Sequence, residues 1–387
     1  MSNAGIEPAT PGLLDASRGP LHPVAARTLE AALSAAWADP ARLHPPGRRA
    51  RALLDTAREV LAGALGVRPD ELSVHVSPEA ALELAISGLR HGRRRTGERV
   101  VAGAAERSVV LVQPGVGAPV PVGATGAVDV EAYAVTLAGG DVAAAGLQTA
   151  NGEVGTRQPV AEIARVCRER DVPLVLDATA SLGRDAVSDA ALAQAPVVVA
   201  DAASFGGPPL GLLAVRTGTR WALPGPRREA EHGREWAAPW VPPVIAAAEA
   251  WRQTAGDRDA EEADARSLVD GIRTAAAVVP DVEVVGDPLD RLPHVVTFSV
   301  LYADGEVLLE ELAGRGLLVA SGSACTSSAL RPSHVLAAMG VLTHGNVRVT
   351  LPLRSVSPDR AADVERLCRE LPDAVATVRR RLGTEDL

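Results

Sequence analysis

Short apolar runs alternate with amphipathic segments along most of the chain. Apolar runs at 141–148, 172–176 and 197–200 have the length of buried strands, and residues 160–170 between them carry apolar positions at helical spacing. Such alternation of strands and helices indicates a parallel sheet with crossover helices. We therefore expect an α/β fold, with a second strand at 211–216 after a tight Gly/Pro turn.

The same pattern predicts the remaining elements and a division into domains. Helices are expected at 24–37, 47–65, 242–268, 304–314 and 358–382, and strands at 72–76, 99–102, 119–122, 282–285, 294–299 and 317–320. The long helix after 242 is heavily charged in its second half and suits a linker between domains. We expect an N-terminal arm (1–22), a large domain with a mostly parallel sheet (23–250), and a linking helix with a small C-terminal α+β domain (251–387).

Composition and charge exclude several classes of partner and site. The 387 residues carry a net charge of −9 and only 2% aromatic residues, which argues against a nucleic-acid partner. No apolar run reaches the length of a membrane span and no basic-then-apolar leader is present, so we expect a cytoplasmic protein with no membrane partner. Three cysteines, an odd and sparse set, suit free thiols in a reducing compartment and show no metal-ligand spacing.

The chain contains no lysine, and all 39 basic residues are arginine. A GC-rich coding bias explains this usage as readily as a functional choice does. In either case, no side chain of this protein can form a Schiff base with an aldehyde.

Two stretches, 172–183 and 197–216, resemble the core of the class V aminotransferases, and most closely the cysteine desulfurases. The resemblance implies the fold-type-I architecture of pyridoxal-phosphate-dependent transferases, with pyridoxal 5'-phosphate as cofactor. In that family a Ser-x-His-Lys run lies within the second stretch, before its Gly/Pro turn, and its Lys binds the cofactor covalently. Ser204 stands at that position here, so covalent attachment is impossible and cofactor binding is doubtful.

The other cofactor positions that the resemblance identifies are partly replaced. Glu79, after Ser77 and Pro78, stands where the family has a phosphate-binding Gly-Thr; alternatively, this run only caps a helix well. Arg107 replaces the His that stacks on the ring, or is a solvated residue at a helix start. Ala180 replaces a Gln that contacts the ring oxygen.

Two residues on the cofactor side are retained. Asp177, at the end of an expected strand, matches the Asp that pairs with the ring nitrogen, unless it is a helix N-cap. Asn151, in the run Asn-Gly-Glu-Val-Gly-Thr-Arg-Gln-Pro, matches an Asn beside the ring and substrate. By contrast, Glu235 aligns with a Thr that contacts phosphate across the dimer interface, which would place a second carboxylate there.

The resemblance also identifies a sulfur side, the residues that would form the persulfide and bind the substrate carboxylate. These residues are nearly all retained. The run Ser-Gly-Ser-Ala-Cys325-Thr-Ser-Ser matches the desulfurase loop whose Cys is the persulfide-forming nucleophile, and Arg348 matches the Arg that clamps the substrate carboxylate. A Cys on such a small, polar loop is expected to be accessible, although a buried inert Cys325 remains the alternative.

Three interpretations follow. The first is a desulfurase-like pseudoenzyme that relays sulfur through Cys325 to an acceptor protein or pairs with a lysine-bearing paralogue. The second is an enzyme that binds pyridoxal or pyridoxamine phosphate without a covalent bond and acts on cysteine or another small amino acid. The third is a structural or regulatory subunit. In each, the family resemblance implies a homodimer or heterodimer in which residues 223–240 reach across, with Trp236 and Trp240 as candidate anchors.

Overall fold

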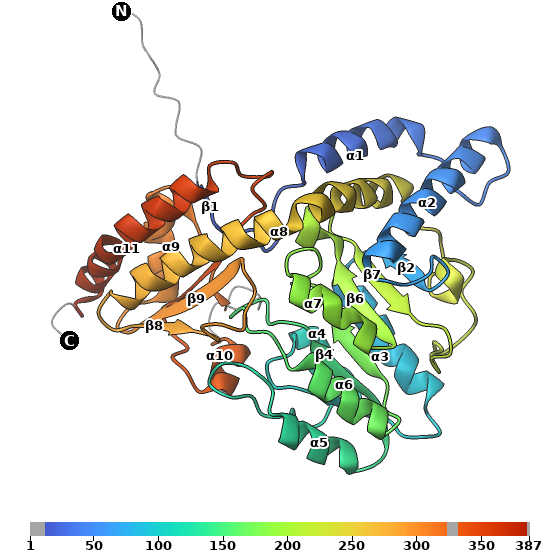
Figure 1. The fold of residues 1–387 in the computed structure, drawn as a ribbon, viewed down its shortest axis with the longest axis horizontal. Helices are drawn as coiled ribbons and strands as arrows, with labels where there is room; N and C mark the ends of the chain where they lie inside the picture. Colours follow the sequence, from blue (N-terminus) through green and yellow to red (C-terminus); the bar gives the residue numbers. More distant parts are fainter. Residues whose placement is uncertain (1–11, 323–331, 385–387) are drawn as a thin grey trace, which may run out of the picture.

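A six-stranded sheet forms the centre of the large domain in the computed structural model, which describes residues 12–322 and 332–384 (Figure 1). Its strands are β2 (Leu72–His75), β3 (Arg99–Ala102), β4 (Val142–Gln148), β5 (Leu174–Asp177), β6 (Val197–Asp201) and β7 (Gly211–Val215). Their order is β2-β7-β6-β5-β4-β3. Strands β3 to β6 pair in parallel, and β7 runs antiparallel to both β6 and β2. The expected α/β fold is confirmed.

Both faces of the central strands are buried, which explains their continuous apolar sequence. Successive side chains of a strand point to opposite faces, so Val198 and Ala200 of β6 lie in one core cluster while Val197 and Val199 lie in another. The first cluster includes side chains of α2, α6 and α8, and the second includes those of α3. The sheet is therefore the middle layer between two sets of helices.

The helices of the large domain have the following bounds: α1 (Pro23–Ala35), α2 (Pro45–Ala64), α3 (Pro78–Gly92), α4 (Ser108–Leu111), α5 (Val130–Ala138), α6 (Val160–Glu169) and α7 (Ala186–Ala191). The 3-10 turns are η1 (Leu192–Gln194), η2 (Ala202–Phe205), which directly follows β6, and η3 (Glu231–Gly233). No helix in the described ranges has the length and apolar character needed to cross a bilayer.

A second, smaller layered unit follows in the chain. Strands β8 (Val282–Val285), β9 (Val295–Val300) and β11 (Asn346–Thr350) form an antiparallel sheet in the order β11-β9-β8, with α9 (Gly305–Gly314), α10 (His334–Met339) and α11 (Arg360–Leu382). The N-terminal arm joins this unit, because β1 (Gly12–Leu13) pairs in parallel with β10 (Leu317–Leu318).

Helix α8 (Val241–Ala277) runs from one unit to the other along one side of the molecule (Figure 1). Its first half contributes Val244 and Ala247 to the large core, where α1 and α2 pack against it. Its second half contributes Val269 and Ile272 to the core of the small unit. It extends nine residues beyond Leu268, the end expected from the sequence.

One expected strand does not form. Residues 119–122 make only isolated bridges, through Val120 and Val122. Pro119 and Pro121 lack the backbone N–H that a ladder requires, so the segment cannot pair continuously.

Candidate functional site

The carboxyl ends of the parallel strands bring three polar positions together. Gln148, the last residue of β4, is in register with Asp177, the last residue of β5. Asp201 ends the neighbouring strand β6. Parallel sheets hold ligands at this edge, so the candidate site is built around Asp177 and Asp201.

The Asp177 carboxylate is buried, and only one of its two oxygens has a hydrogen-bond partner within the described chain. Its Oδ1 accepts a hydrogen bond from the Thr179 backbone N–H at 2.9 Å, whereas its Oδ2 is buried with no hydrogen-bond partner among the described residues. The alternative role as a helix N-cap is wrong, because the next helix, α7, begins at Ala186 and is capped by Asp185. One acceptor of Asp177 therefore remains available inside the site.

Arg107 bridges two sides of the site. Its Nη1 donates to Thr179 Oγ1 at 3.0 Å, just after β5, and its Nη2 donates to Glu79 Oε1 at 2.5 Å, in the first turn of α3. Burial alone would lower the pKa of the guanidinium, but the charges of Asp177, Glu79 and Asp201 together raise it. Arg107 does precede a helix, α4, but its side chain is only 32% exposed and is paired with Glu79.

Glu79 lies at the N-terminus of α3, where the sequence predicts a well-capped helix. Ser77 is the N-cap, its side chain accepts from the Ala80 N–H at 3.1 Å, and Pro78 opens the first turn. Burial opposes ionisation of Glu79, but the backbone and Arg107 outweigh it and lower its pKa. Arg18 of the N-terminal arm approaches the same carboxylate oxygen at 3.5 Å, so Glu79 is held by two arginines.

Ser204 is in η2, and its hydroxyl is occupied by backbone. Its Oγ lies 2.8 Å from the carbonyl oxygen of Leu182 and 2.7 Å from that of Asp201, and its single hydrogen can serve either. Ala180 packs against a small apolar cluster formed by Ala150, Leu292 and Val295. Neither side chain offers a reactive group to the site.

Two carboxyl groups of the site were missed at the sequence level. Glu106 is buried, its Oε1 accepts from the Gln148 N–H at 3.0 Å, and its Oε2 has no partner among the described residues. Burial, assisted by the charge of Asp177, raises the pKa of Glu106 to about 8. Burial likewise raises the pKa of Asp201 to about 6. For Asp201, the available signal was its position at a strand end. For Glu106, the signal was its place directly before Arg107, where the family resemblance has a Glu-His pair.

Asn151 is also near this edge but is fully used in shaping its turn. Its Oδ1 accepts from the N–H groups of Glu153 and Val154 at 2.8 and 2.9 Å. Its Nδ2 donates to the Ala105 carbonyl at 3.0 Å. The amide of Asn151 therefore fixes the loop that carries Glu106, and a direct substrate contact by Asn151 stays a prediction.

The sulfur side is described only in part, because Cys325 lies outside the described residues. Arg348, on β11, is buried, with Nη2 3.9 Å from Asp15 Oδ1 and with Nε unpartnered within the described chain. Backbone pairing of Arg348 with Ala320 places the start of the Cys loop beside this arginine. Glu153 borders the same loop start so closely that a Cβ on Gly322 would collide with its carboxylate.

A contact between the two units links the sulfur side to the carboxylate edge. His334, the first residue of α10, lies with Nε2 2.9 Å from the backbone oxygen of Glu106. The loop before Arg107 is thus held by Asn151 of the large domain and by His334 of the small one.

Glu235 is held at the outer edge of the sheet. Its Oε1 lies 2.6 Å from Nδ1 of His75, the last residue of β2, and its Oε2 lies 3.9 Å from Arg228. The expected role of Glu235 across a dimer interface stays a prediction. In chemical terms, the described site offers carboxyl oxygens and the guanidinium groups of Arg107 and Arg18, and the sequence supplies no primary amine from a side chain.

Comparisons with known proteins agree with this geometry. The aminotransferase class-V family matches residues 23–203. An IscS-like cysteine desulfurase of Mycobacterium tuberculosis is 34% identical over 94% of this chain and 96% of its own, and the cysteine desulfurase IscS of Dictyoglomus turgidum is 28% identical over 89% and 90%. Among solved structures, a NifS-like protein aligns with a TM-score of 0.84 at 20% identity, covering 95% of this chain and 100% of that one.

A second solved structure, the apo cysteine desulfurase of Thermococcus onnurineus NA1, has a TM-score of 0.80 at 18% identity and covers 95% of both chains. These structural likenesses show the fold, that of the fold-type-I pyridoxal-phosphate enzymes, and the 34% identity over nearly the whole chain shows the family. The chain belongs to the class V aminotransferase family, within its cysteine desulfurase branch.

Proposed function

We propose that this chain is a degenerate cysteine desulfurase-like protein, which performs no pyridoxal chemistry of its own and either transfers sulfur through Cys325 or acts as the partner of an active, lysine-bearing paralogue. The observation that carries the proposal is the Arg107 bridge between Glu79 and Thr179 at a site whose lysine position is Ser204. An internal ion pair stands where the family resemblance expects a ring-stacking His and a phosphate-binding turn.

The residues present do not fit the phosphate of pyridoxal phosphate. A phosphate at the N-terminus of α3 needs free backbone N–H groups, but Pro78 has none and the Ala80 N–H is taken by Ser77. The carboxylates of Glu79 and Asp201 both act on Arg107 and would repel a dianion. We therefore derive no step through this cofactor.

Sulfur transfer through Cys325 needs no cofactor of its own. The Cys325 thiolate would attack the outer sulfur of a persulfide, R–S–SH, on the partner; the new S–S bond forms as the old one breaks, and the partner leaves as a thiolate. The outer sulfur keeps its proton, and no external oxidant is required. Such a relay belongs in a reducing compartment, and we place the protein in the cytoplasm.

One observation favours a second candidate function. The buried, unpartnered Oδ2 of Asp177 could accept from a protonated ring nitrogen, which supports non-covalent binding of pyridoxal or pyridoxamine phosphate at low affinity. A role as a purely structural or regulatory subunit is the third candidate, which requires Cys325 to be idle.

Sulfur labelling tests the proposal directly. The purified protein is incubated with an active desulfurase and cysteine, and persulfide is located by alkylation and peptide mass analysis. We expect label on Cys325 and its loss in Cys325→Ser, with Cys167→Ser as the matched control that keeps it. Absence of label on Cys325 in the unaltered protein would contradict sulfur transfer.

A titration with pyridoxal phosphate separates the remaining candidates. No absorbance change beyond that of the free cofactor, and no borohydride-fixed adduct on a side chain, agree with the degenerate interpretation. Saturable non-covalent binding that is lost in Asp177→Asn would favour the second candidate instead.

A further inference from the structure

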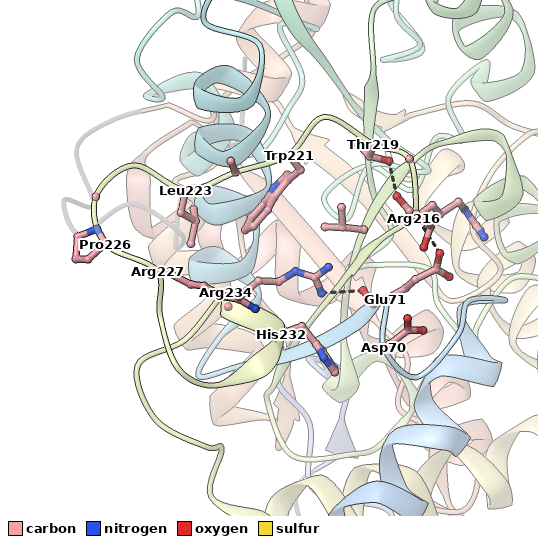
Figure 2. Close-up of a pocket in the computed structure, with 16 residues that line it drawn as sticks. Asp70, Glu71, Arg216, Thr219, Trp221, Leu223, Pro226, Arg227, His232 and Arg234 are labelled. Atoms are coloured by element: carbon pink, nitrogen blue, oxygen red, sulfur yellow. Dashed lines mark hydrogen bonds between the residues drawn. The ribbon is translucent and has the colours of Figure 1, made fainter.

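A cavity of about 480 Å³ opens beside the last residue of β7 (Figure 2). It is lined by residues 70–71, by residues 215–219 from the end of β7 onward, and by residues 221–223, 225–227 and 232–234. Val215 of β7 pairs with Val197 at the start of β6, whereas Asp201 at the end of β6 pairs with Gly211. The cavity and the Asp177 site are therefore at opposite edges of the sheet. Its size is that of a small-molecule site.

Arg234 is the principal charge of this cavity. It is buried, its Nη1 donates to the Glu71 backbone oxygen at 2.8 Å, and its guanidinium lies 5.5 Å from the centre of the Trp221 ring (Figure 2). No carboxylate of the described residues lies within 4.0 Å of it. Burial lowers the pKa of Arg234 to about 10, although the more distant charges of Glu231, Glu71 and Asp70 oppose this shift. A buried guanidinium with no carboxylate in direct contact is costly, which favours an anion in the adjacent space.

The charges around Arg234 also favour an anion in the cavity. Arg227 also borders the cavity and has no hydrogen-bond or ion-pair partner in the described chain. The two acidic residues of the lining are already satisfied: Asp70 is paired with Arg68 at 3.0 Å, and Glu71 accepts the Thr217 N–H at 2.6 Å. A positive cavity thus exists on a chain whose net charge is −9.

The backbone that shapes the cavity is strained and firmly anchored. Glu231, His232 and Gly233 all have positive φ, at 49°, 58° and 89°, and the first two carry side chains that disfavour this region. The Glu231 carboxylate holds the turn through Arg58, with bonds of 2.8 and 2.5 Å, and through the Val74 N–H at 2.7 Å. This turn presents His232 and Arg234 together at the cavity wall (Figure 2).

We propose that this cavity binds a small oxyanion, a carboxylate or a phosphate ester, whose charge is held between Arg234 and Arg227. The site is independent of the sulfur-transfer proposal, because none of its residues belongs to the Asp177 edge or to the Cys loop. Two guanidinium groups can each donate two hydrogen bonds to such an anion, while Trp221, Leu223 and Pro226 offer apolar contact to the group that carries it.

Binding is measured on the full chain by calorimetry with inorganic phosphate, phenyl phosphate and benzoate, and with neutral benzamide as the control ligand. We expect saturable binding of at least one anion, weakening with salt, and no binding of benzamide. Preference for phenyl phosphate or for benzoate assigns the oxyanion. Sedimentation under the same conditions shows whether the assembly changes.

Three variants test the residues. Arg234→Gln and Arg227→Gln should each weaken binding by about tenfold or more, as expected for a charge-assisted bond. Arg227 makes no intramolecular bond within the described chain, so its variant reports on binding even if Arg234→Gln disturbs the fold. Arg220→Gln, an exposed neighbour outside the cavity, should leave binding unchanged. No saturable binding of any anion, or equal binding in all variants, would overturn the proposal.

Discussion

Arg107 Nη2 lies 2.5 Å from Glu79 Oε1, and this ion pair ties the loop before α4 to the first turn of α3. The family resemblance predicts that both residues stand at positions that serve the cofactor, and here the two side chains pair with each other. The two side chains thus compensate each other, since without Glu79 the half-buried Arg107 would lose its direct ion pair.

The compensated pair predicts that Ser204→Lys alone will not restore cofactor chemistry. The new amine would be near the site, but the phosphate would still meet Glu79 and Asp201. We expect the purified single variant to lose any yellow colour on dialysis. A triple variant that adds Glu79→Thr and Arg107→His should retain more cofactor, as measured by absorbance and borohydride trapping. Stable colour in the single variant would show that the carboxylates do not exclude phosphate.

The raised pKa of Glu106, about 8, predicts a dependence of stability on pH. In the unfolded chain this carboxyl has its ordinary, lower pKa, so between the two values the folded state binds more protons. The free energy of unfolding should therefore fall as pH rises from about 5 to 8. Asp201, with a pKa of about 6, contributes in the same direction over the lower part of this range.

The variant Glu106→Gln isolates the Glu106 part of this dependence. Because the amide stays neutral, we expect the free energy of unfolding of Glu106→Gln to exceed that of the parent by ~1–3 kcal/mol at pH 8 and by little at pH 5. Urea unfolding at both pH values provides the measurement. Exposed Glu169→Gln is the control and should not change the slope. If the free energy of unfolding of the parent rises between pH 5 and pH 8, in parallel with that of Glu106→Gln, the raised pKa of Glu106 is contradicted.

Much of this fold could be predicted from the sequence because its strands are apolar on both faces and its helices are amphipathic. The strand at Arg99–Ala102 was predicted with its observed bounds. The strand expected at 119–122 was wrong because an apolar pattern does not report the missing N–H groups of its prolines. The extra length of α8 was missed because its second half buries only a narrow stripe in the small unit.

The site was less predictable than the fold. Residue matching identified Asp177 and Arg107, but it could not reveal that Arg107 pairs with Glu79, because that contact joins segments 28 residues apart. Nor could it show that the amide of Asn151 is consumed by its own turn. The high pKa of Glu106 depends on burial, a property of the assembled domains rather than of any motif.

The buried ion pair between Arg58 and Glu231 predicts that a substitution outside the Asp177 site will strongly lower the free energy of unfolding. Both side chains are buried, with bonds of 2.8 and 2.5 Å, so Glu231→Gln would leave a buried guanidinium without its counter-charge. We expect a loss of ~3–5 kcal/mol in the free energy of unfolding. Glu169→Gln, which breaks the exposed pair with Arg165, should cost less than ~0.5 kcal/mol. Similar losses in the two variants would mean that the pair is solvated in solution.

Differences in thiol reactivity are a further prediction. Burial raises the pKa of Cys167 to about 12, and burial also raises that of Cys368, so both should stay protonated at neutral pH. We expect iodoacetamide to modify Cys325 first, by at least about tenfold in rate at pH 7.5. Time-resolved peptide mass analysis measures all three thiols in one sample. Equal rates, with no transferred sulfur, would leave the idle-subunit interpretation.

The last prediction concerns assembly. Trp236 and Trp240 are 58% and 63% exposed, beside a segment that the Arg58–Glu231 and His75–Glu235 contacts hold against the sheet edge. Large exposed aromatics on a rigid support are typical interface anchors. If they anchor a dimer, Trp236→Ser and Trp240→Ser should each shift sedimentation toward monomer at micromolar concentration. The matched control is Trp37→Ser, since Trp37 is 66% exposed but lies just after α1. Sedimentation of the unaltered chain as a monomer, alone and mixed with a lysine-bearing paralogue, would remove the interface, whereas a dimer that survives both substitutions would place it elsewhere.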